Sequence, residues 1–169
     1  MYNGIMRSRN SSSYYRNFIF GVEDSLVSTV GLLSGISIAG VSNAAILVTG
    51  VVLIFVEAIS MGAGSFLSES SAEIYESHRD GLTDRSYLDA LIMFASYLVS
   101  GFIPLFPYIV LPQDIAFWTS IGLSLAVLFL LGIFGARMSN TSVWRSVTRM
   151  VLVGGSAIAI GSVVGRLLG

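Results

Sequence analysis

Cysteine and lysine are both absent from this chain of 169 residues. Without cysteine there is no disulfide, no zinc–thiolate site and no thiol nucleophile. Without lysine there is no Schiff base and no Ser–Lys dyad. Charged residues make up only 11% of the chain, against about 25% in soluble domains. The formal net charge of −1 provides no basic surface for nucleic acid, so we expect no nucleic-acid partner.

The residues that are abundant are apolar or small. Hydrophobic residues make up 54% of the chain, which also contains 18 glycines, and the mean hydropathy is +0.80. Glycine is frequent in tightly packed membrane helices. This composition predicts an integral membrane protein whose surroundings are a lipid bilayer.

Five apolar stretches are long enough to cross a bilayer, which takes about 20 residues per helix. They span roughly 18–40, 44–67, 87–111, 115–136 and 143–168. We therefore expect an all-α bundle of five transmembrane helices in residues 18–169. Residues 1–17 form an N-terminal segment, and residues 68–86 form a short acidic connection. The first apolar stretch is longer than the core of a signal peptide, so we expect it to stay in the protein as a membrane helix.

The arginines predict how the bundle is oriented, because cytoplasmic loops are enriched in basic residues. Five spans place the two termini on opposite sides. One side then carries eight arginines and the other only one. The eight are Arg7, Arg9, Arg16, Arg79, Arg85, Arg137, Arg145 and Arg149, and the ninth is Arg166. We expect the N-terminus and residues 68–86 to be cytoplasmic and the C-terminus to lie outside or in a lumen.

Three acidic residues fall inside the first two predicted spans: Glu23, Asp24 and Glu57. An ionisable residue inside a membrane marks a functional site by default. At 1.5 Å per residue, Asp24 lies ~9 Å from the cytoplasmic face, and Glu57 lies ~15 Å from it on the antiparallel second helix. Met61 follows Glu57 by four residues and shares its helix face. Asp24, Met61 and Glu57 are therefore expected to line one path from the cytoplasm to mid-membrane.

Carboxylates and a thioether suit a divalent transition metal. Carboxylates are hard ligands, and the thioether adds a softness that Fe²⁺, and more weakly Mn²⁺, tolerates better than Mg²⁺ or Ca²⁺ does. A low dielectric favours the neutral form of a carboxyl group, which can then exchange its proton for a cation. The pattern indicates proton-coupled metal export. Against this stands a structural interpretation, in which Met61 fills a core and Glu57 is a neutral, hydrogen-bonded acid.

Two pairs of glycines and two prolines lie within the predicted helices. Gly31 and Gly35 form one GxxxG pattern, and Gly161 and Gly165 form another. This spacing permits close helix contact, either within one chain or between two copies. With Ser28, the first pair suggests a homodimer whose axis lies at the first helix. Pro104 and Pro107 are expected to kink the third helix and free backbone carbonyls.

The motifs that contain these residues resemble the vacuolar iron transporter family. The stretches "NFIFGVEDSLVSTVGLLSGISIAG" and "EAISMGAGSFLSESSAE" resemble its first two helices, and "SGFIPLFPYIV", "LAVLFLLGIFGARMS" and "WRSVTRMVLVGGSAIAIGSVVG" resemble the other three. The resemblance implies a five-helix homodimer that moves Fe²⁺, and often Mn²⁺, out of the cytosol in exchange for protons. It implies that Asp24 and Met61 line the pathway between protomers. It also implies a prokaryotic cell membrane or, in a eukaryote, a vacuole or another endomembrane.

The chain departs from the plant-like members of that family in two places. Asn17 stands where those members carry an acid, and Glu23 is expected to compensate. Their large cytoplasmic metal-binding domain is replaced by residues 68–86. If the second helix continues, this connection carries an acidic stripe, which is either a solvated helix end or a mouth that collects cations. The stripe consists of Glu69, Glu73, Glu76 and Asp80, and His78 lies off it.

Other classes of function are weighed against transport. A membrane sensor or assembly protein would hold its acids with Ser, Thr or backbone groups, whereas a transporter would turn Asp24 and Glu57 toward a common cavity or axis. An intramembrane hydrolase is not expected, because HExxH and GxGD motifs are missing. We therefore expect a transporter rather than an enzyme, with no cofactor besides the transported ion. The residues do not distinguish a carrier from a channel, or Fe²⁺ from Mn²⁺.

Overall fold

Five long helices account for almost all of the structure, a computed structural model that describes the backbone of residues 2–77 and 84–169 and the side chains of 12–75 and 86–169. Each helix is long and apolar enough to cross a membrane. No strand occurs in the described backbone, so the predicted all-α fold is confirmed. The helices are α1 (Tyr2–Ile38), α2 (Asn43–Ser77), α3 (Asp84–Val110), α4 (Gln113–Met138) and α5 (Val143–Leu168).

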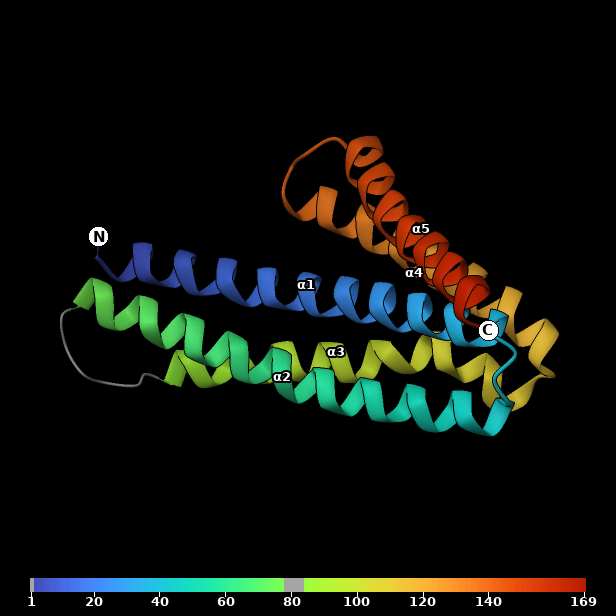
Figure 1. Ribbon diagram of the computed structural model, residues 1–169. Coiled ribbons are helices and arrows are strands. Elements are labelled where there is room, and N and C mark those ends of the chain that lie inside the picture. The colour runs from blue at the N-terminus through green and yellow to red at the C-terminus, as the bar shows by residue number, and fades with distance from the viewer. Residues whose placement is uncertain (1, 78–83) are drawn as a thin grey trace.

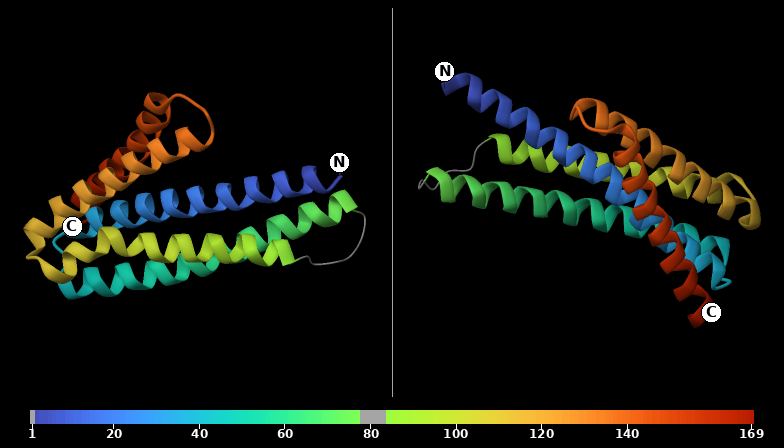
Figure 2. Two further views of the ribbon diagram at one scale, coloured as in Figure 1. Left: turned by 180° about the vertical axis from the view of Figure 1, so that it is seen from behind. Right: turned by 90° about the horizontal axis from the view of Figure 1, so that it is seen from above.

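The helices form two groups (Figure 1). Helices α1, α2 and α3 run lengthwise beside one another, and α3 packs extensively against both α1 and α2. Helices α4 and α5 form a hairpin, and α5 crosses α1 (Figure 2). The termini lie toward opposite ends of the bundle, as an odd number of spans requires. Which end faces the cytoplasm stays a prediction from the arginines.

Two of the helices extend beyond the apolar stretches that predicted them. Helix α1 begins at Tyr2 rather than near Phe18. Helix α2 continues to Ser77. Hydropathy marks where a helix can lie in lipid, not where it ends, and no proline interrupts either extension. The continuity required for an acidic stripe on α2 is therefore present as far as Ser77.

Helix α3 continues through both prolines. The Ser120 hydroxyl of α4 is buried and donates to the Pro104 carbonyl at 2.7 Å. Close by, the Asn43 amide donates to the Tyr108 carbonyl at 3.0 Å. In a membrane core these polar atoms are satisfied by neighbouring helices because water is scarce. The proline segment therefore attaches α3 to both α2 and α4.

The glycine pairs pack against one another within the chain. A Cβ added at Gly35 would lie 2.8 Å from the carbonyl oxygen of Gly161. Side chains added at Gly161 or Gly165 would collide with the carbonyls of Gly31 and Gly35. The prediction that Gly31 and Gly35 provide a dimer face was therefore wrong, because α5 of the same chain covers them. Ser28, the third member of that face, turns to α3 instead. A dimer stays a prediction, but it needs another surface.

Candidate metal pathway

Two acids predicted for the pathway come together at the centre of the α1–α2–α3 group. Asp24 of α1 and Glu57 of α2 are both partly buried, and their carboxyl groups are close enough to interact electrostatically. Because α1 and α2 run in opposite directions, residues at similar depth meet even though they are 33 positions apart in sequence. Counting residues predicted that Asp24, Met61 and Glu57 line one path, with Met61 rather than Glu57 at the depth of Asp24. The structure brings Asp24 together with Glu57, and the path itself stays a prediction.

A third helix contributes to the same place through Tyr97 of α3. This tyrosine is fully buried. Its hydroxyl lies 2.7 Å from the Ser28 hydroxyl, one turn after Asp24 on α1. It also interacts electrostatically with both Asp24 and Glu57. The Ser25 hydroxyl donates to the Tyr97 carbonyl at 2.7 Å, which fixes α1 against α3 at this depth.

Met61 lies one helical turn from Glu57 and lines a cavity of about 610 Å³ between α1 and α2. The cavity is located in the half of the bundle that is predicted to be cytoplasmic. Serines line its α2 side, and Met93 of α3 also contributes to the lining. A partly buried thioether beside hydroxyl groups can bind a soft or borderline cation weakly, so that the ion can leave again.

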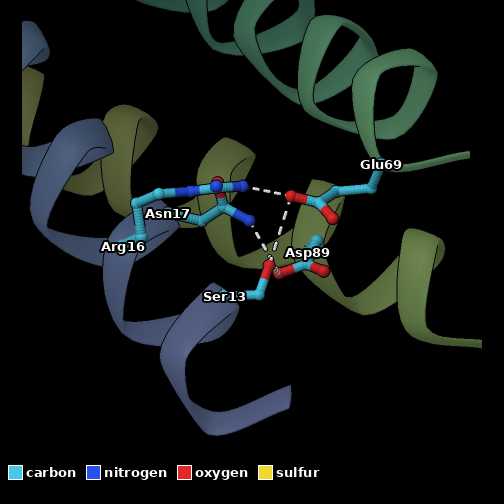
Figure 3. A network of polar contacts seen from close by, with 5 residues as sticks. All are labelled: Ser13, Arg16, Asn17, Glu69 and Asp89. Atoms are coloured by element: carbon cyan, nitrogen blue, oxygen red, sulfur yellow. Dashed lines mark hydrogen bonds and ion pairs between the residues drawn. The ribbon is translucent and has the colours of Figure 1, made fainter. Parts of the chain in front are cut away.

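A polar network closes around the outer part of this cavity (Figure 3). The Ser13 hydroxyl lies 2.9 Å from an Asp89 carboxylate oxygen and 3.3 Å from one of Glu69. The Asn17 amide donates to Asp89 at 2.7 Å, and the Arg16 guanidinium forms an ion pair with Glu69. These side chains from α1, α2 and α3 join the three helices at one end.

Glu23 points away from this group. It lines a second cavity of about 530 Å³ between α1 and the α4–α5 hairpin. There it interacts electrostatically with Arg149 of α5, while its neighbour Asp24 turns to α2. The structure therefore does not bring Glu23 together with Met61 and Glu57. It also places Asp89, not Glu23, beside Asn17, and the expectation that Glu23 compensates for the missing acid stays a prediction.

The acidic stripe of α2 is only partly described. Glu69 belongs to the network of Figure 3, and Glu73 accepts a hydrogen bond from the Ser86 hydroxyl at 3.0 Å. The Glu76 side chain, Asp80 and His78 lie outside the described residues. Among the described residues, no three His, Cys, Asp or Glu side chains gather closely enough to hold a metal ion. The described part of the stripe binds neighbouring helices rather than facing water alone.

Sequence reasoning missed Asp89 and Tyr97. Asp89 lies inside the third apolar stretch and is fully buried, so the rule that singled out Asp24 also applies to it. It lies near the predicted start of that stretch, where the sequence alone does not separate a buried acid from a boundary residue. Tyr97 carries no formal charge, and nothing in its local sequence separates it from a lipid-facing tyrosine. Only the packing of α3 between α1 and α2 reveals it.

Five apolar helices with acids and a thioether inside the bundle define an integral membrane protein. The family model described as the VIT family matches residues 15–86 and 76–166, which together cover most of the chain. A search of curated proteins gives no match. The chain belongs to the VIT family, the vacuolar iron transporters, which confirms the resemblance and indicates metal-ion transport across a membrane.

Proposed function

We propose that this protein exports Fe²⁺ or Mn²⁺ from the cytosol in exchange for protons. The observation that carries the proposal is the meeting of Asp24 and Glu57 from two antiparallel membrane helices. Carboxylates supply the hard oxygen ligands and the negative charge that a divalent cation needs. In this proposal an arriving divalent cation binds between the two side chains and takes the place of protons there, so that metal is exchanged for protons.

In this proposal Met61 makes the site selective for transition metals and lies on the route by which the ion reaches Asp24 and Glu57. It lines the cavity at the predicted cytoplasmic end and shares a helix face with Glu57. An ion entering there meets the thioether first and the carboxyl pair one turn deeper. Each chain then offers Asp24, Glu57 and Met61, and a two-fold homodimer would double the set. The dimer is part of the proposal, with its axis on a face other than the α1–α5 contact.

The alternative is a sensor or assembly protein with structural acids. Such acids are held by hydroxyl or amide groups, as Asp89 is by Ser13 and Asn17. Asp24 and Glu57 instead interact with each other and with the Tyr97 side chain. This difference favours transport for the inner pair and a structural role for Asp89.

The proposal is tested by uptake into proteoliposomes of Fe²⁺, Mn²⁺, Zn²⁺ and Ca²⁺ in parallel. We expect Fe²⁺ and Mn²⁺ to enter at least about tenfold faster than Ca²⁺, because a thioether gives Ca²⁺ little stabilisation. Protein-free liposomes provide the background rate. Equal rates for Ca²⁺ and Mn²⁺ would reject the soft-ligand argument, and no uptake of any ion would reject transport.

Replacing Met61 with leucine tests the thioether itself. Leucine keeps the volume and removes the sulfur, so we expect Fe²⁺ uptake to fall several-fold, by about 3–10 times, and Mn²⁺ uptake to fall less. The measurement is the initial rate for each ion in the same preparation. Met138→Leu, at an exposed position at the end of α4, is the control and should behave like wild type. Equal losses for both ions would mean that Met61 only fills space.

A further inference from the structure

The cavity beside Met61 is lined by a positively charged side chain of the protein itself, that of Arg16. Among its described lining residues, Glu69 is the only carboxylate. The side chain of Glu69 is 12% exposed, and it is paired with the guanidinium of Arg16, whose side chain is 65% exposed. Arg16 also lines the cavity. The guanidinium is therefore the more exposed partner of this ion pair, and the carboxylate is the more buried one.

Neighbouring side chains of α1 contact the acids around the Arg16–Glu69 pair. Ser13, Arg16 and Asn17 share one face of α1, at i, i+3 and i+4. Ser13 contacts Glu69 and Asp89, and Asn17 donates to Asp89 (Figure 3). Ser13 therefore gives Glu69 a contact on α1 besides the guanidinium, and the contacts of Asp89 do not involve Arg16. Arg16 can therefore leave without dispersing the other members of the network.

We infer that the Arg16–Glu69 ion pair is a latch across the mouth of this cavity, opened when a divalent cation replaces the guanidinium at Glu69. This inference rests on the proposed function. Because the guanidinium side of the pair is exposed, where ion pairs contribute less than in the interior, a competing cation can displace it. At equal distance a divalent ion is attracted to the carboxylate twice as strongly as a monovalent group. Exchange therefore favours the transported class of ion over Na⁺ or K⁺.

The kinetic test removes the competing charge. Arg16→Gln should lower the KM for Mn²⁺ about 2–5-fold, the range that the weak coupling of an exposed pair implies, and leave the maximal rate nearly unchanged. Arg16→Lys, which keeps a cation, should resemble wild type. Arg137→Gln is the matched control, since Arg137 is an exposed arginine in the last turn of α4 on the same predicted side. A KM that rises, or an equal effect of Arg137→Gln, would overturn the latch.

A second test does not depend on transport. The chain lacks cysteine, so Ser65→Cys places a single thiol in the wall of the cavity, where the Ser65 hydroxyl is buried. Labelling by a small neutral maleimide is followed in detergent. Adding Arg16→Gln should raise the labelling rate several-fold, by about 2–5 times, and adding Arg137→Gln should not.

Glu69→Gln breaks the same pair from the other side, so it should also speed labelling and provides a second variant if Arg16→Gln fails to fold. Unchanged labelling in a folded protein with either substitution overturns the latch, whatever the flux. If Arg16→Gln speeds labelling but the wild-type protein transports no metal, the latch is supported and the proposed function is rejected. The two failures are therefore distinguishable.

Discussion

Glu57→Gln is expected to fold normally and to lose at least about tenfold of its Mn²⁺ and Fe²⁺ transport, since an ionisable residue inside a membrane is a functional site by default. Glutamine keeps the length and hydrogen-bonding capacity of the side chain but cannot ionise. The metal ion then meets one negatively charged group fewer at the deepest point of its path. The measurement is the initial rate of uptake in proteoliposomes at matched protein content.

Asp114→Asn serves as the control for this result. Asp114 is exposed in the first turn of α4, away from the carboxyl pair. The substitution removes the same charge and should leave uptake unchanged. If well-folded Glu57→Gln retained near-wild-type flux, Glu57 would be a structural acid and Asp24 would be the remaining candidate.

The second large effect is expected on stability, from Gly161→Ala. A Cβ at this position collides with the backbone carbonyl of Gly31 on the crossing helix α1. Backbone cannot move aside as a flexible side chain can, so α1 and α5 must separate. Overpacking of this kind costs about 1–3 kcal/mol. We expect a clear fall in the thermal unfolding midpoint in detergent and a lower yield of monodisperse protein.

Gly155→Ala is the matched control on the same helix. An added Cβ there meets nothing within 4 Å, and alanine favours a helix over glycine by up to about 1 kcal/mol. This variant should be as stable as wild type or slightly more stable. If Gly161→Ala were equally well tolerated while changing only the oligomeric state, the glycines would pack between two copies and not within one.

Much of the architecture was accessible from the sequence. Apolar runs of about 20 residues identify spans because lipid offers no hydrogen bonds to an unfolded backbone. The depths of Asp24 and Glu57 follow from counting residues along two antiparallel helices. The structure places these two carboxyl groups together. Simple helix geometry brings them together because α1 ends at Ile38 and α2 begins at Asn43, so both residues lie the same number of positions from the turn.

Other features depend on rotation and partner choice, which hydropathy does not encode. Glu23 and Asp24 are adjacent in sequence, but about 100° apart around a helix, so one faces α5 and the other faces α2. A GxxxG pattern signals close contact without naming the partner, and here the partner of Gly35 is Gly161. Tyr97 belongs to the site only because α3 packs between α1 and α2.

The most direct test of the central claim is a simultaneous measurement of metal and proton movement in wild-type proteoliposomes with the membrane potential clamped. One dye inside the vesicles reports Mn²⁺ and another reports pH. Exchange at the Asp24–Glu57 pair predicts that Mn²⁺ entry is accompanied by a rise in internal pH. It also predicts that both signals weaken when the external solution is acidified and are lost in Asp24→Asn. Mn²⁺ entry with an unchanged internal pH would contradict exchange of metal for protons at this pair.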